Sequence, residues 1–363
     1  ILSSNDKGFP LMLTTGYDKK ISLLRPDGEI LISKKIDIIP AIYSLGFFIK
    51  AKGESLKNIT SIFIGSAIKK SIIMMLNQEL ETIGQYVLDP EGSDRITFLK
   101  TFNVGSLNLL IAGSLKKFFV GYGRESVEIS FNLPLKDIPI DSDIMPYRDL
   151  VRIAVASTIS NVVRLFELNL RENTLELKAE IREQRRPIQI RMWREYIIVV
   201  TEKGIFVHDF SGSLVSSMGL DNKFGWKNMN LADIDGDNLP EILIGSQWGD
   251  YELAKNAFSN LLVYKINGKT ILKKNYKGWI KFVHSPWSNR IILSAGKTLN
   301  FYQIMNDFSL IELFVQKFDK PSISYDLKVD EKNDYLWISL GLLDGEVGIG
   351  LLEKNGKELS LPI

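Results

Sequence analysis

The sequence predicts an all-β fold, an eight-bladed β-propeller of four-stranded antiparallel blades, and three observations lead to this prediction. Short apolar runs recur eight times along the 363 residues, at a spacing of about 45 residues that is typical of propeller blades. Turn sequences such as Asp-Gly and Asn-Gly recur at one place in the repeat, and they favour tight hairpins. No helical period of comparable strength runs through the chain. A seven-bladed ring, a β-sandwich and two smaller all-β domains stay open as alternatives.

The apolar runs are the expected second strands of the repeats, counted outward from the inner strand. Another short strand candidate, such as Ile96–Phe102, precedes most of them, and a polar break and a third strand follow. Short apolar runs bounded by turn residues are typical of strands that are buried on both faces. The eight runs are Pro10–Gly16, Ser61–Ser66, Leu109–Ser114, Arg152–Thr158, Tyr196–Gly204, Glu241–Ser246, Arg290–Gly296 and Tyr335–Gly341.

The third and fourth strands of a repeat are expected to be joined by a tight turn with glycine at the bend. Glycine adopts positive φ at least cost, as such turns require. The glycines at this place are Gly28, Gly212, Gly268 and Gly356. The first repeat has only Ile1–Ser4 as its inner strand, and the last repeat ends on its outer strand, Lys357–Ile363.

These elements predict a single propeller domain over residues 1–363. Its units are expected at approximately 1–37, 38–90, 91–133, 134–183, 184–220, 221–277, 278–319 and 320–363. Each unit is too small to bury its own apolar face, so stability is expected to come from the contacts between neighbours.

The composition excludes several classes of protein. The net charge of +2 gives no global signal for a polyanion, so any charge argument has to be local. The absence of cysteine rules out disulfides, thiolate metal sites and cysteine nucleophiles. No apolar run reaches about 18 residues, so no transmembrane segment is expected in this chain. Because the chain begins with Ile1, the removal of a leader or an anchor stays open. The Ile- and Lys-rich composition is typical of thermophilic sources.

One acidic cluster precedes the apolar run of the sixth unit. Asp233, Asp235 and Asp237 stand at positions 1, 3 and 5 of a loop, with Leu239 at position 7 and Glu241 at position 9. Hard cations such as Ca²⁺ bind six to eight oxygens from carboxylates and backbone carbonyls. Without a cation, carboxylates this close would repel one another. The spacing therefore predicts one structural Ca²⁺, with an ordinary acidic turn as the alternative.

This segment resembles the calcium-binding FG-GAP repeat of integrin α-subunit propellers and of related bacterial and archaeal repeat proteins. That family carries Asp-x-Asp-Gly-Asp, then an acidic residue and an apolar "LLIG" strand. The resemblance implies the carboxylates of Asp233, Asp235, Asp237 and Glu241 and the carbonyl of Leu239 as ligands of an ion that stiffens the loop. It is close for about 14 residues, Asp233 to Ser246, and elsewhere survives only in the strands and the period.

The other units depart from the family's pattern, so we expect one cation rather than several. The fourth unit has "DSDIMPYRD", which supplies Asp141, Asp143 and Asp149 but places Met145 where an oxygen is needed. We interpret this stretch as a loop between the first and second strands that has lost its metal.

A second candidate site is a basic face for a partner. In a four-stranded propeller, the connections between second and third strands and those between consecutive blades open on the same face. Basic pairs recur in these connections, and the longest of them adds aromatic residues. The candidates are Lys19, Lys20, Lys69, Lys70, Lys116, Lys117, Arg185 and Arg186, with Trp248 and Tyr251 in the longest connection. Such a face attracts acidic protein surfaces, nucleic acid or anionic lipid; the alternative is that the lysines only keep hairpins soluble.

The sequence offers little catalytic machinery. The two histidines, His208 and His284, both lie in strand-like apolar runs, which favours a packing role. We find no nucleophile elbow, phosphate-binding glycine loop or His-containing metal motif. We therefore expect a non-enzymatic interaction scaffold with a protein partner. The alternatives are a Ca²⁺-dependent polysaccharide lyase or hydrolase and a nucleic-acid-associated scaffold that uses the basic face.

The location of the protein stays unknown at this stage. The resemblance implies an extracellular or cell-surface protein, where calcium is abundant. The charged content of 24% and the presence of a single glycosylation sequon, Asn58-Ile-Thr60, slightly favour a cytoplasmic location.

Overall fold

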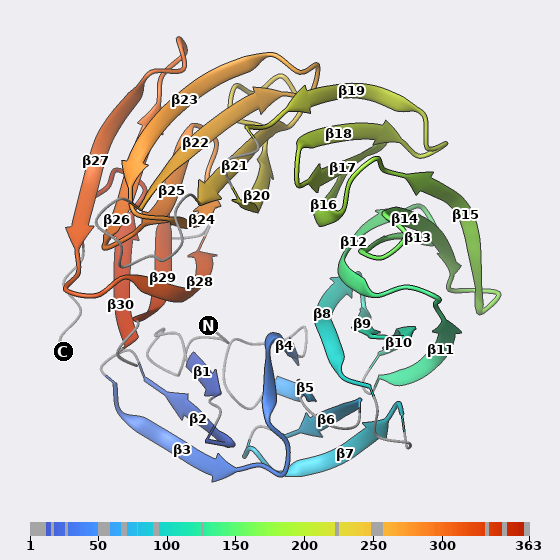
Figure 1. Ribbon diagram of the computed structural model, residues 1–363. Helices are drawn as coiled ribbons and strands as arrows, with labels where there is room; N and C mark the ends of the chain where they lie inside the picture. The colour runs from blue at the N-terminus through green and yellow to red at the C-terminus, as the bar shows by residue number, and fades with distance from the viewer. Residues whose placement is uncertain are drawn as a thin grey trace. The chain divides into compact units, whose positions relative to one another are not determined.

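The computed structural model describes residues 12–15, 18–25, 28–49, 59–66, 71–77, 79–89, 94–124, 127–221, 225–247, 257–330, 334–342 and 347–358. The fold is all-β, an eight-bladed β-propeller of antiparallel sheets, as the sequence predicts (Figure 1). The β-sandwich and seven-bladed alternatives are therefore wrong. The described residues contain no helix, and so no helix of the length and apolarity needed to cross a membrane.

The described chain divides into two compact units. The first takes in residues up to Ser142 and Pro146–Leu177, and the second takes in Asp143–Met145 and the residues from Lys178 onward. The boundary therefore passes through the first and fourth strands of the fourth sheet. That the chain is one domain stays a prediction.

The first unit holds the first three sheets and most of the fourth, each with its strands in chain order. Their strands are β1 (Met12–Thr15), β2 (Lys20–Leu24), β3 (Ile30–Lys35), β4 (Pro40–Ile49), β5 (Ile59–Ser66), β6 (Ile72–Leu76), β7 (Thr82–Val87), β8 (Ile96–Val104), β9 (Leu107–Ser114), β10 (Lys117–Gly123), β11 (Glu128–Pro134), β12 (Pro139–Tyr147), β13 (Leu150–Ser157), β14 (Val162–Asn169) and β15 (Thr174–Arg182). The inner strand expected at Ile1–Ser4 lies outside the described residues.

The second unit holds the last four sheets, again with their strands in chain order. Their strands are β16 (Pro187–Trp193), β17 (Tyr196–Thr201), β18 (Gly204–Asp209), β19 (Leu214–Gly219), β20 (Gly225–Ala232), β21 (Glu241–Gln247), β22 (Phe258–Lys265), β23 (Thr270–Lys277), β24 (Ile280–His284), β25 (Arg290–Ala295), β26 (Thr298–Ile304), β27 (Leu310–Lys317), β28 (Ser322–Asp330), β29 (Tyr335–Leu342) and β30 (Val347–Glu353). The outer strand expected at Lys357–Ile363 is described only in part. Its residue Glu358 forms a β-bridge with Leu352, and residues 359–363 lie outside the described ranges.

The eight apolar runs form strands, and from the second sheet onward each is the second strand of its sheet. These strands are buried almost throughout, as in β9 and β21. The fourth strands consist mainly of exposed and partly buried positions instead, and in β11 the two alternate. A strand covered on both faces by neighbouring blades reads as a continuous apolar run, whereas a strand covered on one face alternates.

The hydrophobic core consists of the interfaces between consecutive blades. In the second unit, one cluster joins Ile198 and Val207 of one blade to Ile242 and Ile244 of the next. The following interface joins Leu243 and other residues of the sixth blade to the seventh. Burying an Ile or Leu side chain contributes about 1.5–3 kcal/mol. A blade therefore depends on its neighbours within the unit, as the repeat pattern predicts.

The predicted glycine turns are present. Gly28, Gly212, Gly268 and Gly356 have φ of 84°, 87°, 92° and 90°. In the second blade the same turn position holds Leu80 at φ 58°, which is only 2% exposed. Holding a leucine in the left-handed region costs about 1–2 kcal/mol, and burial of its side chain in the core offsets this cost.

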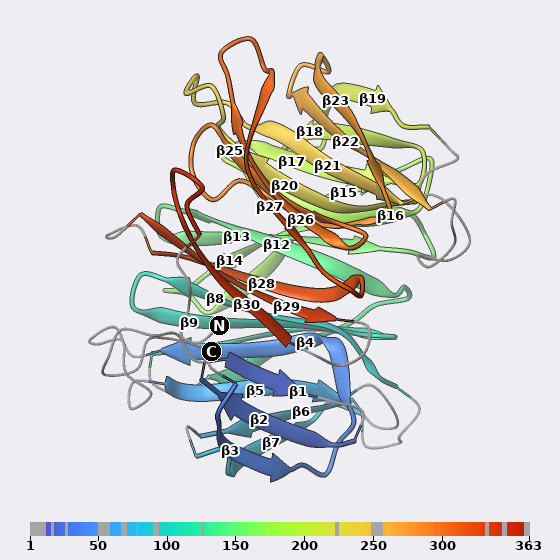
Figure 2. The same cartoon turned by 90° about the vertical axis from the view of Figure 1, so that its left-hand side faces the viewer.

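The connections between second and third strands share one edge of each blade with the connections between blades. We call it the BC/DA edge. The Ile36 N–H donates to the Lys19 carbonyl at 2.8 Å, and the Leu135 N–H donates to the Lys116 carbonyl at 2.7 Å. Figure 2 shows the hairpins of the sheets at two opposite edges. The shared edge that the sequence analysis assumed for the basic residues is therefore present within each blade.

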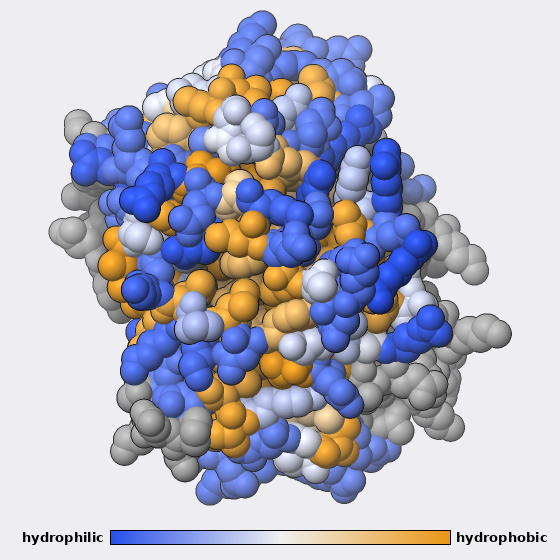
Figure 3. Space-filling model, turned by 90° about the vertical axis from the view of Figure 1, so that its right-hand side faces the viewer, coloured by the Kyte–Doolittle hydropathy of each residue, from blue (hydrophilic) through white to orange (hydrophobic). Residues whose placement is uncertain are grey.

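The fourth strands keep apolar side chains on their exposed positions. Leu177 of β15 and Leu214 of β19 are 50% and 57% exposed. Figure 3 shows apolar side chains among hydrophilic ones on the side of the molecule that it displays. Single exposed hydrophobic residues are normal on a protein surface, so they do not define a site.

Candidate cation-binding loop

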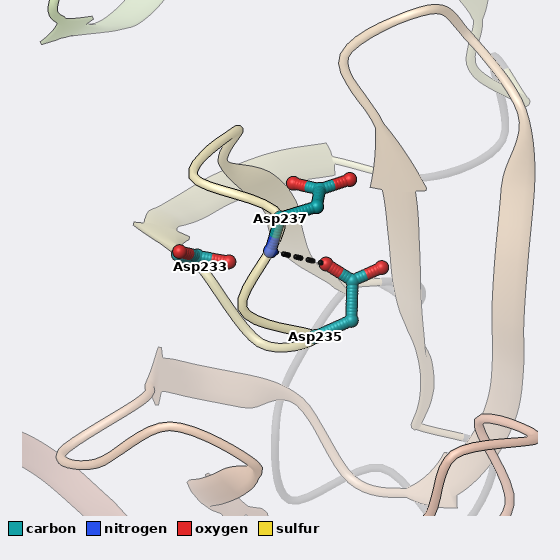
Figure 4. Close-up of side chains that lie close together, drawn as sticks. All are labelled: Asp233, Asp235 and Asp237. Carbon is teal, nitrogen blue, oxygen red and sulfur yellow. Dashed lines mark hydrogen bonds between the residues drawn. The ribbon is translucent and has the colours of Figure 1, made fainter.

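The acidic cluster forms the connection between β20 and β21 in the sixth blade. β20 ends at Ala232 and β21 begins at Glu241. Two residues of the connection, Gly236 and Asn238, have φ of 79° and 67°. Glycine and asparagine are the residues that adopt this region most readily. They curl the chain so that the three aspartates gather around one turn (Figure 4).

Each of the three aspartates accepts hydrogen bonds from the backbone of its own loop. Asp233 accepts the N–H of Gly236 at 2.8 Å and that of Asn238 at 3.0 Å, one on each carboxylate oxygen. Oδ1 of Asp235 accepts the Asp237 N–H at 3.3 Å. Side-chain oxygens of the three residues lie within 4.8 Å of one another. The three carboxylates therefore gather around one turn, and their role as ligands of a cation stays a prediction.

The third aspartate and the last residue of the motif complete the loop. Oδ1 of Asp237 accepts the Leu239 N–H at 2.8 Å, and this bond is the main cause that lowers the pKa of Asp237. The Glu241 side chain is only 1% exposed, and its Oε2 accepts the Ile234 N–H at 2.7 Å. Burial is the main cause that raises the pKa of Glu241 to about 7. The side chain of Leu239 is exposed, and its carbonyl as a ligand stays a prediction.

Lys265 reaches the same carboxylates from β22. Its Nζ lies 2.5 Å from Oδ2 of Asp235, 3.0 Å from Oδ2 of Asp237 and 3.9 Å from Oε1 of Glu241. Lys265 is the cross-strand partner of Glu241 in the β21–β22 ladder, so pairing of the strands brings it there. The hydrogen bonds to Asp235 and then Asp237 raise the pKa of Lys265.

Lys265 is not among the site residues predicted from the sequence. A signal for it exists, because Lys265 ends the third strand just before the Asn-Gly turn. In a meander of antiparallel strands, the end of the third strand lies opposite the start of the second. Three aspartates alone suit a hard cation, but a cation bound by Asp235 and Asp237 would have to displace this ammonium. With Lys265 in place, the residues do not fit a divalent ion.

The acidic stretch of the fourth blade is strand up to Tyr147, so the prediction that Asp141 and Asp143 lie in a loop was wrong. Asp141 and Asp143 lie on the first strand, β12. Asp141 accepts a hydrogen bond from Nζ of Lys100 at 2.5 Å, and Asp143 accepts the Met192 N–H at 2.8 Å. These carboxylates therefore take part in contacts between consecutive first strands.

Other polar side chains of the first strands also bond to the next blade. Oε1 of Gln189 accepts the Met229 N–H at 2.7 Å, while its Nε2 donates to the Met229 carbonyl at 3.4 Å. Asn230 bonds Nδ1 of His284 at 3.0 Å. Burial lowers the pKa of His284. These side chains therefore take part in contacts between consecutive blades.

His208, the other histidine, is also packed. It lies on β18 with 6% exposure, and its Nε2 lies 2.8 Å from Oε1 of the equally buried Glu183. A buried carboxylate needs such a partner. The expected packing role of both histidines agrees with these positions.

The basic residues of the BC/DA edge differ in how freely they face solvent. Lys20, Lys116, Arg185 and Arg186 are exposed, whereas Lys19 and Lys117 are partly buried. Nζ of Lys117 donates to the Leu88 carbonyl at 3.4 Å, and Nε of Arg186 lies 3.5 Å from Glu202. The remaining predicted partner residues, Lys69, Lys70, Trp248 and Tyr251, lie outside the described residues.

Comparison with known proteins identifies the fold of this chain but no family. No protein-family model matches the chain, and no curated protein matches it, so membership of the FG-GAP family stays a prediction. Sqt1 of Saccharomyces cerevisiae matches with a TM-score of 0.71 and 10% identity, over 97% of this chain and 94% of that one.

Two further structures extend the comparison. Dihydro-heme d1 dehydrogenase NirN matches with a TM-score of 0.63 and 12% identity, over 96% of this chain and 72% of that one. BBS1N, in complex with ARL6DN, matches with a TM-score of 0.55 and 12% identity, over 79% and 84%. At such identities the likeness establishes the propeller fold that these chains share with the present one, and nothing beyond the fold.

Proposed function

We propose that this protein is a non-enzymatic interaction scaffold that binds a protein partner through the BC/DA edges of its blades. The observation that carries the proposal is the exposure of Lys20, Lys116, Arg185 and Arg186 at these edges. They lie at or next to the ends of strands that pack between blades, so the backbone positions of these residues are set in advance.

The chemistry of the inner strands supports a scaffold over an enzyme. Asp141 and Asp143 are bonded to Lys100 and to the Met192 backbone, and His284 is bonded to Asn230. Each of these groups has a hydrogen-bond partner within the chain, which favours a structural role for it.

A protein of this fold is also found in a protein complex. The fold neighbour BBS1N is in complex with ARL6DN. For the present chain, the exposed basic residues favour a partner with an acidic surface. Charges at the rim of an interface act mainly on the association rate and on specificity. Binding is therefore expected to weaken as the salt concentration rises.

The acidic loop belongs to the opposite edge of its blade, where the first and second strands join, and we assign it no part in partner binding. The Ca²⁺ that its resemblance implies is an untested prediction of the sequence, and the position of Lys265 beside the carboxylates argues against it.

The proposal is tested by charge reversal at the BC/DA edge. The variant Lys20→Glu, Lys116→Glu, Arg185→Glu and the wild type are used as baits in the native source, and captured proteins are quantified by mass spectrometry. The variant Arg148→Glu, Lys269→Glu changes exposed basic residues of the opposite edges and is the matched control. We expect one partner to be lost from the first variant and kept by the second.

The purified partner is then titrated against all three proteins at two salt concentrations. Equal affinity for the wild type and the BC/DA variant would refute the proposal. A captured nucleic acid that accounts for the binding would refute it as well, in favour of the nucleic-acid alternative.

A further inference from the structure

We propose that Lys265 is the resident cation of the loop Asp233–Glu241. Its ammonium holds the carboxylates together, so the loop keeps its folded form without a divalent metal ion. This inference concerns the edge opposite the proposed partner edge and is independent of it.

The hydrogen bonds divide the carboxylate oxygens into two sets. One oxygen each of Asp235, Asp237 and Glu241 accepts a backbone N–H of the loop. The other oxygen of each faces the Lys265 ammonium, at 2.5, 3.0 and 3.9 Å respectively. The ammonium thus lies where the three side chains converge, as a bound cation would.

The fourth carboxylate completes this arrangement without the ammonium. Both oxygens of Asp233 accept N–H groups, from Gly236 and from Asn238. Backbone donors and one lysine together therefore engage all four carboxylates of the motif.

The backbone of Lys265 is itself fixed. Its N–H donates to the Lys269 carbonyl at 2.9 Å, and its carbonyl accepts the Gly268 N–H at 2.9 Å. Lys265 pairs with Glu241 across the β21–β22 ladder. The side chain consequently starts from a set position beside the loop, so no backbone freedom of Lys265 is lost when its ammonium binds the carboxylates.

The next blade covers the ammonium from another side. Nζ of Lys265 lies 6.0 Å from the ring centroid of Phe308, within the range in which a cation is attracted to an aromatic face. Phe308 holds φ of 62° in the turn between β26 and β27, a region that side chains rarely adopt. Lys265 thereby links its own blade to the seventh one.

A calcium ion would have to break this arrangement before it could bind. It needs six to eight oxygens, and the ammonium occupies the side of three carboxylates. Removing Lys265 would leave Asp235, Asp237 and Glu241 without their cation. The loop should then need a metal, and it should bind one.

The test compares the wild type with Lys265→Met, which keeps the length of the side chain but loses its charge. Melting temperatures are measured in EDTA and in millimolar calcium, and calcium binding is measured by titration calorimetry. We expect the wild type to melt at the same temperature in both solutions and to show no saturable calcium binding. Lys265→Met should melt several degrees lower in EDTA, recover in calcium and bind calcium saturably.

Two further variants serve as controls. Lys269→Met removes an exposed charge from the same turn and should behave as the wild type does. Asp235→Asn, Asp237→Asn in the Lys265→Met background removes the repulsion and should restore stability in EDTA.

The wild-type measurement decides the proposal even if Lys265→Met fails to fold. A wild-type melting temperature that rises in calcium, or saturable calcium binding by the wild type, would overturn it. A folded Lys265→Met protein that ignores calcium and matches the wild type in EDTA would overturn it too.

Discussion

Two acid-rich stretches of this chain, Asp141–Asp149 in the fourth blade and Asp233–Glu241 in the sixth, share a spacing of aspartates but fold differently. The first continues as strand β12 through Tyr147 and then turns within two residues, with Arg148 at φ 55°. The second leaves its strand at Ala232 and forms a longer loop before Glu241. Aspartate spacing alone therefore does not specify a loop.

The residues between the aspartates account for the difference. In the sixth blade, Gly236 and Asn238 supply the positive φ angles on which the curled loop depends. In the fourth blade, Ile144 and Met145 stand between the acidic residues, and neither favours that region. In both stretches, basic side chains of the same chain engage the carboxylates, Lys100 in one and Lys265 in the other.

The largest expected effect tests whether the sixth blade differs from the fourth in its packing as well as in its loop. Gly245 of β21 stands at the place that Ala156 fills in β13. A Cβ at Gly245 would lie 3.0 Å from Cβ of Ile280 and still closer to its methyl group. We expect Gly245→Ala to lower the free energy of unfolding by about 1–3 kcal/mol through overpacking, measured by urea denaturation.

The reverse exchange in the fourth blade is the control for that prediction. Ala156→Gly removes a buried methyl group and adds backbone freedom, at a cost of about 1 kcal/mol. A Gly245→Ala protein as stable as the wild type would mean that the two blades are packed alike.

The second effect tests the pairing of Asp141. The side chains of Lys100 and Asp141 are 28% and 12% exposed, and their charged atoms lie 2.5 Å apart. Lys100→Met removes the ammonium that faces a mostly buried carboxylate, and we expect it to cost about 1–3 kcal/mol in urea denaturation. Adding Asp141→Asn should recover part of the loss. If the single variant is neutral, the fourth blade does not depend on the ammonium that Lys100 supplies from the preceding blade.

The third prediction concerns the pH dependence of stability. It distinguishes the contribution of His284, on an inner strand, from that of the carboxylates in the two acidic stretches. Burial lowers the pKa of His284 below 6.5, so the unfolded chain binds its proton more readily than the folded one. Stability from this group is present above pH 6.5 and is lost as the pH falls toward the lower folded pKa. We expect the melting temperature to fall over this range and His284→Gln to reduce that fall. An unchanged pH profile in His284→Gln would assign the acid sensitivity to the carboxylates instead.

Local patterns account for most of what could be predicted. Apolar runs such as Leu109–Ser114 became buried strands because both faces are covered, and Gly268 became a turn because the turn demands positive φ. The convergence of Asp233, Asp235 and Asp237 followed from short-range spacing around a glycine.

What could not be predicted depends on contacts between elements distant in sequence. Lys265 meets the acidic loop through the β21–β22 register, and Asp141 meets Lys100 from the preceding blade. Leu80 takes a turn position suited to glycine because the core receives its side chain. A partner's identity depends on the surface of another molecule, which this sequence does not contain.

The smallest expected effect concerns the turn that ends the acidic stretch of the fourth blade. Asp149 pairs with Arg171 at 3.0 Å, but the two side chains are 61% and 75% exposed. Exposed ion pairs gain little, because water screens the charges and both side chains lose freedom. We therefore expect Arg171→Ala to change the free energy of unfolding by at most about 0.5 kcal/mol, in contrast to Lys100→Met. A larger loss would show that solvent exposure does not determine how much each of these two ion pairs of the fourth blade contributes to stability.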